Sequence, residues 1–193
     1  MNPKLLVCLT LGAVVWLAGC DDPRARLAGS LEVAQTGAGR SAAADALVAD
    51  FRAGRVTLDL AIDHAFFTLD DGQAAYAYIG AVLDFADRIS DAIPASPEAS
   101  ELLLRRLGRL AFAGAESAAA AGDVGTARSL VFAGPKRWQD EAYWLRYPDH
   151  DALASMLLAA TGDRSEALRR LEARPVLFAP ADEAFERIRS SHP

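Results

Sequence analysis

The sequence predicts an all-α protein built from antiparallel helical hairpins. Apolar residues recur at helical spacing in every substantial segment after residue 40, and no segment shows the alternation and β-branched content of strands. Short turns separate the helical segments, and antiparallel neighbours are the usual result of such connections. With 52% hydrophobic and 24% charged residues, the composition is that of a globular chain.

The expected helices follow one another toward the C-terminus, each marked by an apolar stripe. The stripes run over Leu58 to Leu69, Ile79 to Ile93, Leu103 to Gly114, Leu153 to Ala160 and Ala181 to Ile188. Thr57 is available as the N-cap of the first stripe, and Ser96 followed by Pro97 is a strong start for the third. Asp149, after Pro148, is expected to cap the fourth. Turns are expected at Asp70-Asp71-Gly72, Gly122-Asp123, Gly134-Pro135, Tyr147-Pro148-Asp149 and Gly162-Asp163.

Residues 1–19 have the three-part build of a secretory signal: a positive charge at Lys4, an apolar run from Leu5 to Leu17, and small residues at the cut. The run is too short to span a bilayer, which needs about 20 apolar residues. Residues 20–40 contain proline and several glycines with weak periodicity. We expect them to form a linker, with at most one helical turn around Arg26 to Ala34, to a helical domain of residues 41–193.

The segment Leu17-Ala18-Gly19-Cys20 resembles the lipobox of bacterial lipoproteins. The resemblance implies diacylglycerol on the Cys20 thiol, cleavage before Cys20 and acylation of the new amino terminus. It therefore implies a protein anchored by lipid in a bacterial cell membrane and facing the periplasm. Asp21 resembles the signal for retention at the inner membrane, and the outer membrane is the alternative. Cys8 leaves with the signal, so no thiol remains for a disulfide.

Two segments in the second half of the chain are similar to each other. Residues 119–130 and 159–171 both contain small residues, Gly-Asp, three further residues, alanine and then an apolar position. Glycine closes one helix in the left-handed conformation, aspartate caps the next, and alanine lets the two backbones approach. Glu166, three residues after Asp163, fits a capping box.

This pattern is similar to a tetratricopeptide repeat (TPR), most clearly over residues 151–180. The turn glycine, the cap, the small packing residue and the apolar positions are matched by Gly162, Asp163, Ala167, Leu168 and Leu171. Leu158 replaces the usual tyrosine of the motif, and residues 41–121 contain no convincing copy. The resemblance implies a short right-handed solenoid that presents a groove to a protein partner.

The densest aromatic cluster of the chain is mixed with basic residues. The candidate binding residues there are Trp138, Tyr143, Trp144, Tyr147, Arg137 and Arg146. Such a surface is suited to a peptide or to the sugar face of a cell-wall glycan. The alternative is that Trp144 and one tyrosine wedge into the groove between repeats.

Acidic residues form two stripes in the first half of the chain, Asp59, Asp63 and Asp70 on one and Asp84, Asp87 and Asp91 on the other. Such stripes are typical of the solvated side of amphipathic helices, and a surface for divalent cations or basic peptides is the alternative. Residues 41–101 hold eleven acidic residues and three arginines, whereas residues 102–193 hold twelve acidic and thirteen basic residues. The net charge of −6 makes nucleic acid a poor partner.

Catalysis, metal binding and cofactor binding have no signature in the sequence. His64 and His150 adjoin aspartates, but neighbours in sequence do not face one another on a helix. No Gly-x-Ser-x-Gly elbow occurs, and Gly37-Ala38-Gly39 lacks the lysine and the strand of a phosphate loop. We therefore expect a protein that is not an enzyme and carries no metal or cofactor.

Together these features favour a membrane-anchored adaptor or assembly scaffold that meets a protein partner in the bacterial envelope. The alternative is an envelope lipoprotein that binds a glycan or a small ligand, with or without hydrolase activity. A purely structural lipoprotein is a third interpretation.

Overall fold

The computed structural model describes residues 22–36, 39–93, 96–135, 141–173 and 179–190, and every regular element within these ranges is helical. The α-helices are α2 (Pro23–Gln35), α3 (Gly39–Arg52), α4 (Leu58–Phe67), α5 (Gln73–Arg88), α6 (Pro97–Ala120), α7 (Val124–Val131), α8 (Glu141–Arg146), α9 (Pro148–Ala160), α10 (Arg164–Glu172) and α11 (Ala179–Ser190). Two short 3₁₀-helices, η1 (Leu69–Asp71) and η2 (Ser90–Ala92), follow α4 and α5. The all-α prediction is confirmed.

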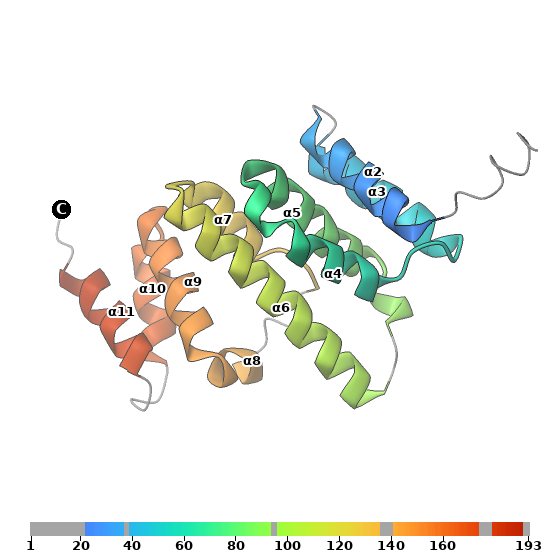
Figure 1. Ribbon diagram of the computed structural model, residues 1–193. Coiled ribbons are helices and arrows are strands. Elements are labelled where there is room, and N and C mark those ends of the chain that lie inside the picture. The colour runs from blue at the N-terminus through green and yellow to red at the C-terminus, as the bar shows by residue number, and fades with distance from the viewer. Residues whose placement is uncertain (1–21, 37–38, 94–95, 136–140, 174–178, 191–193) are drawn as a thin grey trace, which may run out of the picture.

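Successive helices pack as hairpins that stack side by side (Figure 1). The pairs are α2 with α3, α4 with α5, α6 with α7, and α9 with α10, and α11 packs on α9 and α10. Along the stack α2 contacts α4 and α4 contacts α6, while α3 contacts α5 and α5 contacts α7. The first helices α2, α4 and α6 therefore follow one another along one side of the molecule. Against the preceding hairpin, helix α9 packs mainly on α7, and the start of α9 reaches α6, where His150 stacks on Phe112. We term the side formed by α2, α4, α6 and the start of α9 the first-helix face.

The core is centred on α5, whose Tyr78, Ile79, Leu83 and Phe85 are fully buried. One continuous apolar cluster extends from α2 to α9, and a second joins α9, α10 and α11. Short turns make the stacking possible: Gly122 and Gly162 both adopt positive φ, +83° and +97°. Only glycine takes this conformation without strain, as expected for a helix closed by a left-handed residue.

Helix α2 replaces most of the linker expected over residues 20–40. The Asp22 carboxylate caps it by accepting a hydrogen bond from the Arg24 backbone N–H at 3.0 Å. Leu27, Ser30 and Ala34 are buried against α3 and α5. Burial of this face, rather than helix propensity, stabilises the segment as a helix. Its glycine and proline residues therefore indicated a linker where the structure has a helix.

Helix starts agree with the sequence in three places and differ in two. The side chains of Thr57, Ser96 and Asp123 accept hydrogen bonds from the backbone three residues on, as predicted. The capping box predicted at Asp163 and Glu166 is wrong: the Asp163 side chain makes no cap bond and contacts Arg128, while Glu166 binds Arg169. Asp149 is also not a cap, because helix α9 already begins at Pro148.

Candidate functional site: a hollow on the first-helix face

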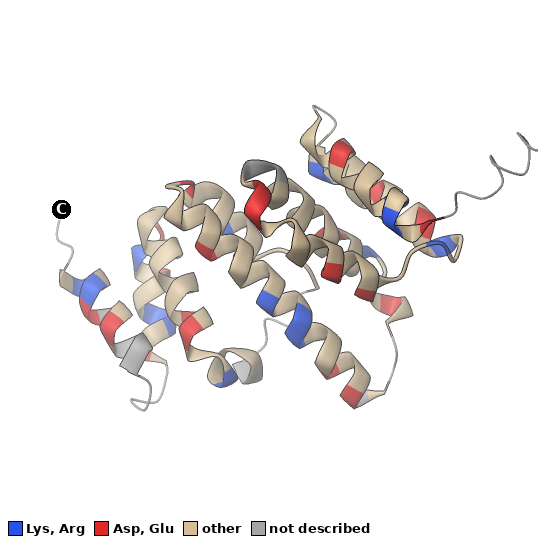
Figure 2. Cartoon of the chain, viewed as in Figure 1, with Lys and Arg blue, Asp and Glu red and all other residues tan. Residues whose placement is uncertain are grey.

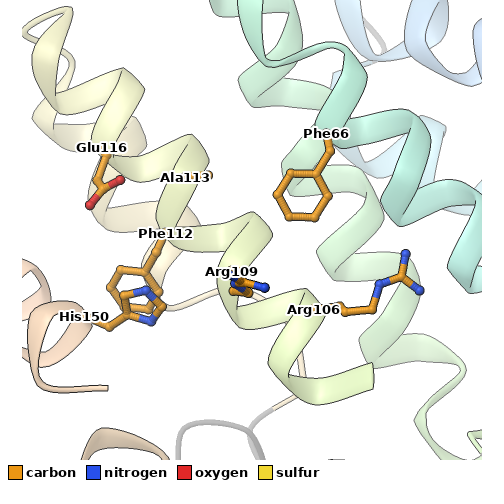
Figure 3. Close-up of a pocket in the computed structure, with 7 residues that line it drawn as sticks. All are labelled: Phe66, Arg106, Arg109, Phe112, Ala113, Glu116 and His150. Carbon is orange, nitrogen blue, oxygen red and sulfur yellow. The ribbon is translucent and has the colours of Figure 1, made fainter. Parts of the chain in front are cut away.

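Helices α4, α6 and α9 surround a hollow of about 400 Å³ (Figure 3). Its lining comprises Phe66 of α4, His150 of α9, and five residues of α6: Arg106, Arg109, Phe112, Ala113 and Glu116. Spacings of three and four residues place Arg106, Arg109, Ala113 and Glu116 on one side of α6. The long helix α6 thus supplies most of the lining, and its two neighbours supply aromatic walls.

Arg106 and Arg109 differ in their electrostatic surroundings although both line the hollow. The Arg106 guanidinium donates to the carboxylates of Asp59 and Asp63 on α4 and is thereby neutralised. Arg109 is exposed, and the structure gives its side chain no carboxylate partner within the described residues. Arg109 is therefore the cation that the hollow offers to a ligand.

His150 is held in a fixed orientation at the hollow. Its ring stacks on Phe112 with centroids 3.9 Å apart and planes 8° from parallel, and its Nδ1 lies 2.8 Å from the Tyr143 hydroxyl. Burial lowers the pKa of His150 to about 4; the negative charge of Asp149 opposes this shift, and the positive charge of Arg109 adds to it. The imidazole is consequently neutral at pH 7, so it adds hydrogen-bonding capacity without charge.

Glu116 lies at the far end of the hollow from Arg106 (Figure 3). It is seven residues after Arg109 on α6, which corresponds to a rise of about 10 Å along the helix. Arg109 lies between Phe66 on one side and His150, stacked on the buried Phe112, on the other (Figure 3). The hollow therefore presents an exposed guanidinium and an exposed carboxylate beside half-buried rings.

The structure brings together the three rings of the predicted aromatic cluster that it describes: Tyr143 contacts both Trp144 and Tyr147. Tyr143 and Trp144 are buried, with 8% and 4% of their surface exposed, and Trp144 packs on Phe112. Tyr147 is half-buried, and Arg146 is exposed and pairs with Glu101. Trp138 and Arg137 lie outside the described residues.

Gly108 shows how closely this cluster is packed against α6. A Cβ atom at residue 108 would lie 2.2 Å from the Tyr143 hydroxyl oxygen and 2.9 Å from two of its ring atoms. The ring of Tyr143 thus occupies the space that a side chain at this position would need. Tyr143 positions His150 from beneath the hollow rather than presenting its own ring to a ligand.

Several residues of the acidic stripes form ion pairs with arginines of neighbouring helices. Asp59 and Asp63 receive Arg106, and Asp84 receives Arg40 through two hydrogen bonds of 2.6 Å. Within the described residues, no three histidine, cysteine, aspartate or glutamate side chains converge as metal ligands. Figure 2 shows acidic and basic residues interspersed along the stack.

Comparison of the chain with protein-family models, with curated proteins and with solved structures gave no match. Among the helices of the described ranges, none is long and apolar enough to cross a membrane.

Proposed function

We propose that this protein is a lipid-anchored lipoprotein of the bacterial envelope that acts as a protein–protein interaction adaptor or assembly scaffold. The hollow between α4, α6 and α9 carries the proposal, because the exposed Arg109, which has no carboxylate partner among the described residues, lies there beside the half-buried rings of Phe66 and His150. The lipobox-like segment ending at Cys20 supports the anchor, with Asp21 favouring the inner membrane.

The lining of the hollow favours a peptide segment as its ligand. Arg109 offers a charge-assisted hydrogen bond to a carboxylate, and the half-buried Phe66 offers apolar surface in the same hollow. Glu116, about 10 Å further along α6, favours a basic group at the other end of the segment. The preferred partner therefore carries an acidic residue next to an apolar one, with a basic residue beyond.

We also propose that the hairpins form a short, right-handed, TPR-like solenoid. Its support is the equivalence of the two turns: Gly122 and Gly162 share positive φ, and Ala127 and Ala167, five residues later, are both fully buried. Both alanines occupy the position at which the TPR motif requires a small residue, so that the two helices of a hairpin can approach closely. In such solenoids, successive hairpins together form one continuous surface to which ligands bind.

The glycan-binding alternative draws less support from the structure. It depends on exposed aromatic rings that stack on sugars. The buried rings of Tyr143 and Trp144 are not available for such stacking.

The anchor is tested by cell fractionation and mass spectrometry of the mature N-terminus. Cys20→Ala should leave the membrane fraction, and the wild-type N-terminal peptide should carry acyl chains on Cys20. An unmodified Cys20, or an unchanged membrane fraction for the variant, would contradict the anchor.

The adaptor role is tested by co-purification from crosslinked, detergent-solubilised membranes. Arg109→Glu should lose a stoichiometric protein partner that the wild type retains, with affinity lowered at least about tenfold by loss of a charge-assisted bond. Arg187→Glu on α11 is the matched control, because Arg187 is also exposed and lies away from the hollow. Equal recovery from all three proteins, or no partner from the wild type, would argue against the adaptor.

A further inference from the structure

The lipidation site predicted at Cys20 lies only three residues before the first helical residue, Pro23. Three residues span at most about 10 Å even when fully extended. Because α2 is packed on α3 and α5, it cannot serve as a long tether. An anchor at Cys20 would therefore hold one particular end of the helical stack close to the lipid headgroups.

That end of the first hairpin is basic. Four arginines gather where α2 begins and α3 ends: Arg24, Arg26, Arg52 and Arg55. Arg26 and Arg55 both contact the Asp50 carboxylate, at 3.2 and 2.9 Å, which shows that the two segments adjoin. Among the described residues of this hairpin end, the four arginines are opposed by two acidic residues, Asp50 and the capping Asp22, so this group is positively charged.

Arg24 and Arg52 are the charges available to an outside partner. Both are exposed, and neither side chain forms an ion pair with a carboxylate of the described residues. The neighbouring end of the stack, at η2 and the start of α6, carries the acidic Asp91 and Glu98 instead. A negatively charged surface would consequently attract the first hairpin and repel the next part of the stack (Figure 2).

We propose that the exposed arginines at the start of α2 and the end of α3 form a docking surface for the anionic lipid bilayer to which the protein is anchored. This inference rests on the lipid anchor of the proposed function. The short connection from Cys20 to Pro23 keeps the first hairpin close to the bilayer, and the attraction of Arg24 and Arg52 to anionic headgroups turns this end of the hairpin toward it. Each arginine near an anionic surface favours contact roughly fivefold, so the pair favours the docked orientation roughly thirtyfold.

Docking would fix the direction in which the stack leaves the membrane. The turns that close the hairpins at their other ends, including Gly122-Asp123, would face away from the bilayer. Helix α6 alone rises about 36 Å over its 24 residues. The hollow on its side would then be held above the headgroups, where the folded part of a partner can reach it.

The test uses the full lipidated protein reconstituted into vesicles that contain a headgroup-labelled quencher lipid. A fluorophore is attached either through Ala53→Cys, beside the docking surface, or through Ala121→Cys at the opposite end; both positions are exposed. In vesicles of equal parts phosphatidylglycerol and phosphatidylcholine, the label at residue 53 should be quenched strongly and that at residue 121 weakly.

The difference in quenching between residues 53 and 121 should nearly disappear in vesicles of phosphatidylcholine alone. It should also nearly disappear in the Arg24→Gln, Arg52→Gln double variant, whereas the Arg187→Gln control should retain it. Equal quenching at both positions in anionic vesicles would overturn the proposal, as would a contrast that persists without anionic lipid or without the two arginines. Flotation with the vesicles reports separately on the anchor: a wild-type protein that fails to float would reject the anchor and the docked orientation together.

Discussion

Replacement of Gly108 by alanine is expected to destabilise the protein, although the same change usually stabilises a helix. Gly108 lies inside α6, where alanine would normally gain about 1 kcal/mol. At this position the added Cβ would lie 2.2 Å from the Tyr143 hydroxyl oxygen. Tyr143 is buried and its hydroxyl is bonded to His150, so the ring cannot turn out of the way without cost.

The magnitude follows from three effects. Overpacking of a buried site costs about 1–3 kcal/mol, and loss of the Tyr143–His150 hydrogen bond costs about 1 kcal/mol more. The gain in helix propensity offsets about 1 kcal/mol of this total. The net loss is about 2 kcal/mol, which for a chain of this size lowers the Tm by about 4–8 °C.

Gly29→Ala is the matched control for this prediction. Gly29 lies in the middle of α2, and a Cβ there would meet no atom within 4 Å. That variant should gain about 0.5–1 kcal/mol and melt slightly above the wild type. Thermal unfolding of the three proteins by circular dichroism gives the comparison. A Gly108→Ala protein that is as stable as Gly29→Ala would refute the described packing of Tyr143 on α6.

Two further predictions concern the histidine of the hollow and the two repeat turns. The folded-state pKa of His150, about 4, is below its unfolded value of about 6.5, so the unfolded chain binds the proton more readily and stability should be lost as pH falls from 6.5 toward 4. His150→Gln should flatten this part of the Tm–pH curve and leave a smaller slope from His64, whose pKa burial also lowers; an unchanged slope would contradict the assignment. Asp123→Ala should cost about 1 kcal/mol in urea unfolding, because it removes the cap of α7. Asp163→Ala should cost less in high salt, because Asp163 makes no cap bond and its partly exposed pair with Arg128 is screened there. Equal losses for the two variants under the same conditions would contradict the finding that only Asp123 caps its helix.

Features set by a few adjacent residues could be predicted from the sequence. The caps at Thr57 and Ser96 and the turn at Gly122 depend on local backbone geometry, and all three are present. Asp163 shows the limit of this approach. Its sequence context is that of a cap, but Arg128 from the preceding hairpin draws its carboxylate away. A contact between residues 35 positions apart leaves no sign in the local pattern.

The full length of helix α2 and the hollow could not be predicted from the sequence, for a related reason. The segment that forms α2 has weak periodicity, and its stability comes from burial of Leu27 and Ala34 on helices that follow it. The hollow combines Phe66, Arg109 and His150 from three separate helices. The periodicity of each helix predicts which side is apolar but not which helices become neighbours. The aromatic cluster was conspicuous in sequence, yet its Tyr143 and Trp144 support the site from below.

Site-specific photocrosslinking in intact membranes tests the central claim most directly. A photoreactive amino acid replaces Phe66 in the wall of the hollow or, as a control, Ala49, which is exposed on α3 away from it. The adaptor proposal predicts a discrete crosslinked protein from position 66, none from position 49, and loss of the adduct when Arg109→Glu is added. No adduct at position 66, or an adduct that is indifferent to Arg109, would contradict the proposal that this hollow binds a protein partner.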